Sequence, residues 1–234
     1  MTLPAIEPAQ RTAARLVGFL YLLTNATAIF AFTVRGRLIV HGDAAQTAGN
    51  IAASERLFRV GIVAELVTVA AVILLVAASY VVLKPVNRNA ALVAVFWRLA
   101  ENFILAIVVL NELAALRLLS GAEYLRAVDT QQLQALAFTL LRVYGDGFRV
   151  GFVFLGLGSA VFAYLWLKSR YIPRALAAVG IFGSLLMAIV ESAILVFPGL
   201  ASAVGMAYMA PMGVFEIGGG FWLLVKGIRA PSGA

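Results

Sequence analysis

Six long apolar runs, separated by short segments rich in charged residues, glycine or proline, dominate the pattern along this chain. Each run supplies the roughly 20 residues that a helix needs to cross about 30 Å of hydrocarbon. The runs cover residues 14–34, 58–83, 90–118, 147–167, 175–197 and 202–225. The pattern therefore predicts an all-α fold: a polytopic membrane helix bundle of six transmembrane helices, in a single integral membrane domain over residues 1–234.

The two longer connections are expected to hold short interfacial helices that lie against the bundle. Residues with the spacing of a helix capping box occur there in three pairs. The pairs are Asp43 and Gln46, Ser120 and Glu123, and Asp129 and Gln132. Residues 131–144 also place leucines on one helical face, which predicts an interfacial helix ahead of the fourth span.

Two parts of the chain resemble each other and suggest an internal repeat. The motif Phe-Arg-Val-Gly occurs at residues 58–61 and again at 148–151, and Glu101 corresponds to Glu191. Duplication of 58–105 as 148–195 predicts that spans two and three superpose on four and five about an axis along the membrane normal. Repeated composition in a sequence rich in Leu, Val and Ala is the alternative explanation.

Composition and charge agree with this class of protein. The chain is 63% hydrophobic and 12% charged, and its mean hydropathy is +0.98. A net charge of +7 would suggest nucleic acid in a soluble protein, but here basic residues gather between apolar runs, so no nucleic-acid partner is expected. By the positive-inside rule these residues predict that both termini are cytoplasmic. The residues on that side are Arg11, Arg15, Lys84, Arg88, Lys168, Arg170, Arg174, Lys226 and Arg229.

The residue inventory excludes several kinds of chemistry. With no cysteine and one histidine, the chain cannot build a disulfide framework, an iron–sulfur cluster or a multi-histidine metal site. It also lacks a phosphate-binding glycine loop and a G-x-S-x-G motif, which argues against nucleotide-driven pumps and serine hydrolases. We therefore expect no metal and no cofactor.

Polar residues inside the spans are the strongest indication of a site. Each ionisable residue there costs about 2.5–3.5 kcal/mol on insertion scales, so it usually faces the bundle interior. Counting about 1.5 Å per residue places Asn25, Glu101 and Glu216 near the bilayer midplane, with Arg98 one turn from Glu101. The i,i+3 spacing predicts an Arg98–Glu101 ion pair and leaves Glu216 without a basic partner. A carboxyl buried in this way favours its neutral form, so Glu216 is the candidate proton donor.

We expect Arg98, Glu101 and Glu216 to converge on an interior cavity with Asn25 on its wall. Aromatic residues near the same depth are predicted to bind a lipid-soluble substrate together with Asn25. These aromatic residues are Trp97, Phe103, Phe215 and Trp222. A second polar layer nearer the outer surface is predicted to form a vestibule. Its residues are Glu65, Glu112, Asp146, Arg149 and Glu191.

Each of these sets also has a structural interpretation. The aromatic residues could serve only core packing or lipid contact, and the vestibule residues could be ordinary ion pairs on a solvated rim. The midplane residues could act only as a polar clamp between helices.

Three functions follow, and the sequence does not decide among them. The first is an intramembrane acid–base enzyme acting on a lipid-soluble, isoprenoid-like substrate, with Glu216 as general acid and the Arg98–Glu101 pair as base or orienting group. The second is a proton-linked small-molecule transporter or exporter. The third is a non-catalytic membrane scaffold or accessory subunit. The expected partners are membrane lipid, a lipid-soluble small molecule and a second copy of the chain in a homodimer.

Four segments carry a resemblance to a known family. They are residues 42–64, with Gly42-Asp43-Ala44-Ala45 and Ser54-Glu55-Arg56-Leu57-Phe58-Arg59, the turn 83–89, the stretch 171–174 and the closing 221–227. In these segments, and over nearly its whole length, the chain resembles the bacterial membrane family called domain of unknown function 4386. The resemblance implies a multi-pass protein of the bacterial inner (cytoplasmic) membrane. It implies no catalytic residues.

Overall fold

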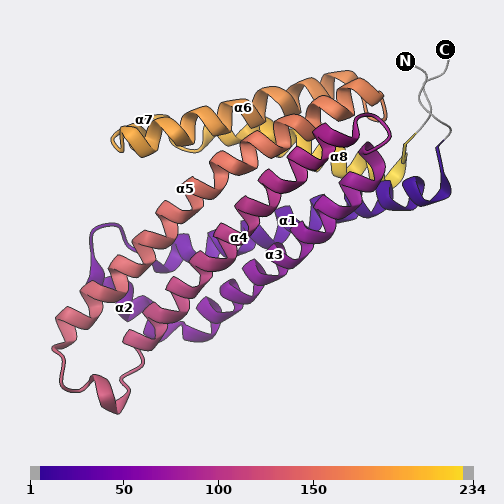
Figure 1. Ribbon diagram of the computed structural model, residues 1–234. Coiled ribbons are helices and arrows are strands. Elements are labelled where there is room, and N and C mark those ends of the chain that lie inside the picture. Colours follow the sequence, from indigo (N-terminus) through magenta and orange to yellow (C-terminus); the bar gives the residue numbers. More distant parts are fainter. Residues whose placement is uncertain (1–5, 229–234) are drawn as a thin grey trace.

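The computed structural model describes residues 6–228, and this range consists mostly of long helices joined by short turns (Figure 1). No strand occurs within it, which confirms the all-α prediction. The elements are α1 (Pro8–Leu38), α2 (Ala44–Ala53), α3 (Glu55–Leu83), α4 (Arg88–Leu118), the 3-10 turn η1 (Glu123–Leu125), α5 (Thr130–Ser169), α6 (Arg174–Val196), α7 (Leu200–Val204), the 3-10 turn η2 (Ala207–Met209) and α8 (Ala210–Val225).

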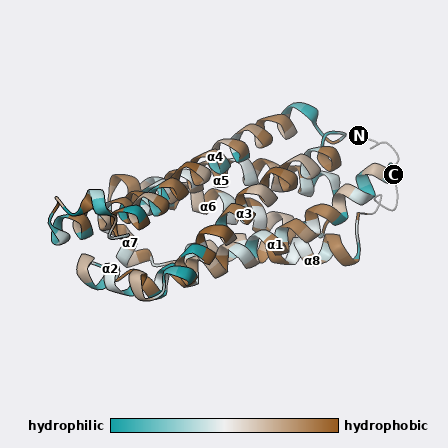
Figure 2. Cartoon of the chain, turned by 90° about the horizontal axis from the view of Figure 1, so that it is seen from below, coloured by the Kyte–Doolittle hydropathy of each residue, from teal (hydrophilic) through white to brown (hydrophobic). Residues whose placement is uncertain are grey.

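Six helical segments are long and apolar enough to cross a membrane, as predicted. They are α1, α3, α4, α5, α6 and the segment Ala207–Val225, which contains α8. A helix satisfies its backbone hydrogen bonds internally, so it suits a bilayer that offers no water to its polar groups. Figure 2 shows apolar residues along the helices and hydrophilic residues gathered toward the end that carries α2 and α7. The fold is that of a multi-pass membrane protein.

Two of the predicted boundaries are wrong. The interfacial helix expected over 131–144 is not separate, because α5 continues unbroken through Gly145 and Gly147 to Ser169. Each glycine costs a helix about 1 kcal/mol relative to alanine, but close packing of Gly147 against Val108 of α4 favours the continuous helix. The sixth span begins later than residue 202, because Gly205 adopts a φ of +58° and ends α7.

The capping residues of the connections were predicted correctly in two of three places. Asp43 accepts a hydrogen bond from the Gln46 amide at 2.8 Å and begins α2. Asp129 likewise accepts from the amides of Gln131 and Gln132 and begins α5. Ser120 begins no helix: its hydroxyl donates to the carbonyl of Arg117 and accepts from the amide of Ala122, and Ala122 is the cap of the short turn η1.

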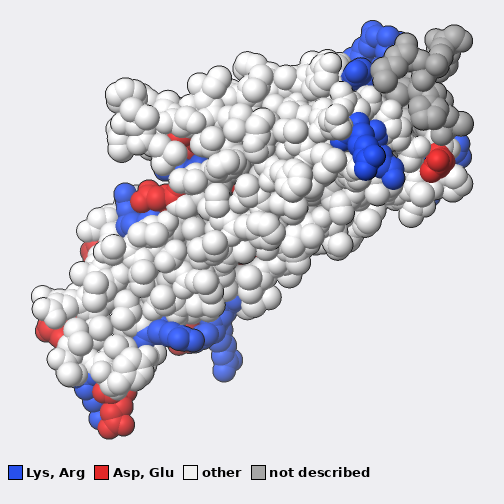
Figure 3. Space-filling model, in the orientation of Figure 1, with Lys and Arg blue, Asp and Glu red and all other residues white. Residues whose placement is uncertain are grey.

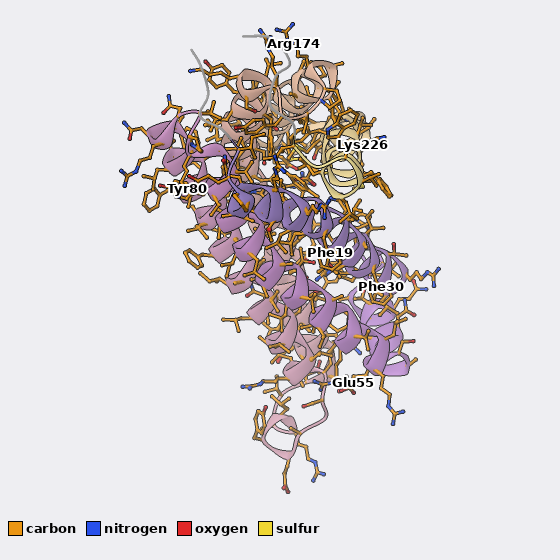
Figure 4. The ribbon with its side chains drawn as sticks, turned by 90° about the vertical axis from the view of Figure 1, so that its right-hand side faces the viewer. Phe19, Phe30, Glu55, Tyr80, Arg174 and Lys226 are labelled. Atoms are coloured by element: carbon orange, nitrogen blue, oxygen red, sulfur yellow. The ribbon has the colours of Figure 1, made fainter. Side chains whose placement is uncertain are left out.

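The spans form two packed parts. Helices α1, α3, α4 and α5 lie side by side as a body, and the α6–α8 unit packs on this body through α5 and α1 (Figure 1). We call the end where α1 begins and α8 ends the terminal end, and the end that carries α2 and η1 the distal end. Arg174 and Lys226 lie at the terminal end and Glu55 lies at the distal end (Figure 4).

The hydrophobic core differs between the two ends. The largest buried cluster joins both parts and includes Trp166, Phe215 and Leu223. A second cluster toward the distal end, around Ile51 and Phe58, is built from α1–α5 without the α6–α8 unit. Figure 3 shows the molecule hollowed between the two parts on this side. The parts are therefore tightly packed at one end and separated at the other.

Replacing Gly156 with alanine is expected to loosen the contact between α5 and α6. A Cβ atom at Gly156 would lie 2.5 Å from the Ser184 carbonyl oxygen and 2.8 Å from the Ala188 nitrogen. Both atoms belong to the backbone, so the helices must move apart, at a cost of about 1–3 kcal/mol. Thermal unfolding in detergent measures the change. Gly145→Ala in the same helix meets no atom within 4 Å and is the control, so equal melting of both variants would contradict this packing.

Candidate functional site

The ion pair predicted within α4 is present. Arg98 and Glu101 are 4% and 1% exposed, and Arg98 Nη1 lies 3.1 Å from Glu101 Oε2. These two atoms make no hydrogen bond within the described residues, so they attract each other by charge without hydrogen-bond alignment. Asn102 is also buried and donates to the Val69 carbonyl of α3, while its own side-chain oxygen accepts no hydrogen bond there. This face of α4 keeps unused hydrogen-bonding capacity inside the bundle.

Glycines of α5 make room for these side chains. A Cβ atom at Gly158 would lie 2.7 Å from Arg98 Cγ, and one at Gly151 would lie 3.8 Å from Glu101 Cγ. Small residues at such interfaces let helices approach closely. The glycines on α5 therefore provide the space that the charged side chains of α4 occupy.

Glu216 is held by an amide rather than by a cation. Asn25 Nδ2 of α1 donates to Glu216 Oε2 of α8 at 2.9 Å and also lies 2.9 Å from the Tyr21 carbonyl oxygen. Both Asn25 and Glu216 are partly exposed. Within the described residues Glu216 makes no ion pair.

The four midplane residues therefore divide into one ion pair and one hydrogen-bonded pair. Arg98 contacts Glu101 within one helix, and Asn25 contacts Glu216 across two helices. No hydrogen bond in the described range joins one pair to the other, and the convergence of Arg98, Glu101 and Glu216 on one cavity stays a prediction.

The aromatic residues near this depth do not enclose Glu216. Phe215 is buried and packs edge-on against Tyr21, with ring centroids 6.0 Å apart. Trp97 is half-buried, whereas Phe103 and Trp222 are 57% and 38% exposed on the outside of the bundle. Phe103 and Trp222 therefore lie on faces of α4 and α8 that turn away from the neighbouring helices, and the substrate contacts predicted for them stay predictions.

Two of the predicted vestibule residues belong to a buried cluster around Arg35. Arg35 Nη2 donates to Glu112 Oε2 at 3.0 Å and also pairs with Glu65. The Tyr144 hydroxyl donates to Glu65 Oε1 at 2.6 Å, and the guanidinium carbon lies 4.1 Å from the Tyr144 ring centroid. Because these residues come from α1, α3, α4 and α5, the cluster ties together the whole body.

Two others form a separate contact between the parts. Arg149 Nη1 of α5 lies 3.2 Å from Glu191 Oε2 of α6, and the Tyr208 hydroxyl donates to Glu191 Oε1 at 2.6 Å. Asp146 is exposed on α5 and takes part in neither cluster. The single vestibule is therefore corrected to two clusters with Asp146 outside both. Figure 3 shows charged side chains in the hollow between the parts.

Sequence reasoning missed Arg35, Tyr144 and Tyr208. Arg35 follows the first apolar run, which ends at residue 34, but α1 continues to Leu38 and so carries Arg35. One signal was available: Glu65 and Glu112 lie inside apolar runs and need a cation, since buried charges are paired. No comparable signal distinguishes Tyr144 and Tyr208 from the other tyrosines.

Tyr144→Phe is expected to destabilise the protein by about 1.5–3 kcal/mol, because it removes a hydrogen bond to a charged and buried carboxylate. Chemical or thermal unfolding in detergent measures the loss. Tyr164→Phe is the matched control, since Tyr164 lies on the same helix with 50% exposure. A Tyr144→Phe protein as stable as the control would mean that the hydroxyl contact contributes nothing.

Comparison with known proteins supplies a family and no activity. The family model described as Domain of unknown function (DUF4386) matches residues 16–227, nearly the whole chain. The chain belongs to this family. No curated protein and no solved structure matches it. The matched range contains both midplane pairs and the clusters around Arg35 and Glu191, so all of these residues lie in the part of the chain that this family shares.

Proposed function

We propose that this protein is a proton-linked transporter that exchanges a proton for a small organic cation at Glu216. The supporting observation is the charge count near the midplane. Arg98 carries one positive charge, whereas Glu101 and Glu216 can each carry one negative charge. Asn25, which donates a hydrogen bond to Glu216, is uncharged. The site thus has one carboxylate more than its arginine can neutralise.

An excess negative charge of this kind favours the exchange of a proton for a cation. An uncompensated buried charge costs several kcal/mol, so the carboxylate is stabilised by taking up either a proton or a cation. Since one neutralising partner removes the need for the other, binding of the cation releases the proton. Aromatic side chains stabilise organic cations, and the rings of Tyr21 and Phe215 contact each other near the Asn25–Glu216 pair.

The position of Glu216 links its charge to the contact between the two parts. Over the described residues, two side-chain hydrogen bonds cross from the body to the α6–α8 unit: Asn25 to Glu216 and Arg149 to Glu191. A hydrogen bond to a carboxylate is about twice as strong as one between neutral groups. Neutralising Glu216 therefore weakens one of these two bonds. This shifts the equilibrium between different positions of the α6–α8 unit on the body.

We place this activity in the bacterial inner membrane with the terminal end in the cytoplasm. Basic side chains at that end, such as Arg174 and Lys226, support this orientation through the positive-inside rule. The hollow between the parts would then open away from the cytoplasm.

An intramembrane acid–base enzyme with a lipid-soluble, isoprenoid-like substrate is the second candidate. The observation in its favour is the partial exposure of Glu216 on the short helix α8, which gives a molecule in the bilayer access to the carboxyl. The outward position of Phe103 and Trp222 counts against it, because a developing carbocation needs aromatic faces around it. A scaffold role requires only that the buried pairs hold helices together.

Cation uptake by reconstituted protein tests the proposal. Liposomes with an acidic interior, with and without the full-length protein, receive tetraethylammonium or ethidium outside. We expect the protein to accelerate accumulation of at least one cation, and nigericin, which collapses the pH gradient, to abolish this effect. Uptake of both cations at the rate of protein-free liposomes, or uptake indifferent to nigericin, would contradict proton-linked exchange.

A further inference from the structure

A pocket lies at the distal end, where α3 begins and α4 ends. It is lined by Arg59, Leu113, Leu116, Arg117 and Ser120. This pocket belongs to neither midplane pair nor to the clusters around Arg35 and Glu191. Its lining joins two guanidinium groups to two leucines, so one side suits an anion and the other suits hydrocarbon. We propose that it binds the phosphate headgroup of an anionic phospholipid.

The two arginines leave positive charge available in the pocket. Arg117 is exposed and forms no ion pair within the described residues. Arg59 contacts Glu55 at 2.7 Å, but these side chains are 56% and 51% exposed. An exposed pair contributes little free energy, so Arg59 can turn from Glu55 to a ligand. Guanidinium groups bind phosphate through paired hydrogen bonds, which makes phosphate the best-matched anion.

The helix ends do not by themselves explain both arginines. A basic residue in the last turn of a helix stabilises the helix dipole, and this is sufficient reason for Arg117. Arg59 lies beside the N-terminal turn of α3, where the dipole favours an anion rather than a cation. An anion between Arg59 and Arg117 would be stabilised by both side chains.

The apolar part of the pocket favours a lipid over free phosphate. Leu116 is buried in the distal core and Leu113 packs against that core, so the pocket floor is hydrocarbon. Val60 and Val63 continue along α3 from the pocket with 52% and 57% exposure, and they offer an acyl chain a surface toward the bilayer centre. Inorganic phosphate gains nothing from these contacts.

Native mass spectrometry of the full-length protein in detergent tests this site. The probes are phosphatidylglycerol and phosphatidylcholine with identical acyl chains, and inorganic phosphate as a competitor. We expect wild type to prefer phosphatidylglycerol by about tenfold, which corresponds to two charge-assisted contacts of modest strength. The double variant Arg59→Gln/Arg117→Gln should bind both lipids equally, and the single variant Arg117→Gln should fall between the two.

Arg126→Gln is the matched control, because Arg126 is an exposed arginine at the same end outside the pocket. It should keep the full preference for phosphatidylglycerol. A double variant that melts like wild type and keeps this preference would overturn the proposal. Displacement of phosphatidylglycerol by millimolar inorganic phosphate would also overturn it, since the pocket would then recognise phosphate alone. None of these outcomes depends on cation transport.

Discussion

Arg98→Leu is expected to lower the free energy of unfolding by about 3–5 kcal/mol, the usual cost of removing one member of a buried ion pair. Arg98 and Glu101 are almost completely buried, and their charged atoms lie 3.1 Å apart. Leucine would leave Glu101 without a counter-charge inside the bundle. Thermal melting in detergent and the yield of folded protein from the membrane measure the effect.

Two further variants identify the cause of this loss. Arg98→Leu/Glu101→Gln removes the stranded charge and should recover most of the stability. Arg126→Leu removes a cation from an exposed pair with Glu123, whose atoms are 3.7 Å apart, and should melt like wild type. An Arg98→Leu protein that is as stable as Arg126→Leu would show that the buried pair does not hold the bundle together.

Glu216→Gln is expected to leave the protein folded and to abolish proton-driven cation uptake. Glutamine keeps the shape of the side chain, and its amide oxygen can still accept the hydrogen bond from Asn25. It cannot bind or release a proton at neutral pH. The free energy of unfolding should therefore change by less than about 1 kcal/mol, while cation uptake in liposomes falls to the protein-free rate.

Glu123→Gln serves as the control for loss of a carboxylate, because Glu123 is 88% exposed in the distal connection. It should transport at the wild-type rate. Full transport by a well-folded Glu216→Gln protein would remove Glu216 from the mechanism. The purely structural interpretation of the midplane residues would then be favoured.

The parts of the fold that depend on local sequence were predictable. Span length and hydropathy predict the six membrane helices, because the bilayer imposes a minimum apolar length on each. The Arg98–Glu101 pair was predictable for a similar reason, since its spacing within one helix places the two side chains together. The duplication of 58–105 as 148–195 stays a prediction.

Contacts between distant helices were not predictable from one sequence. Arg35 meets Glu112 across 77 residues and Tyr144 meets Glu65 across 79, and both contacts depend on how each helix is rotated in the bundle. The inward and outward positions of Phe215 and Phe103 depend on the same rotation. Lipid and protein interior are both apolar, so hydropathy does not distinguish the two environments.

Proton release on cation binding is the most direct test of exchange at Glu216. Purified protein in weakly buffered detergent solution, with a pH indicator, is titrated with the cation that it transports. We expect the wild-type protein to release about one proton for each cation bound. The Glu216→Gln protein should release none. Cation binding to wild type without proton release, or equal release by the Glu216→Gln protein, would contradict exchange at this residue.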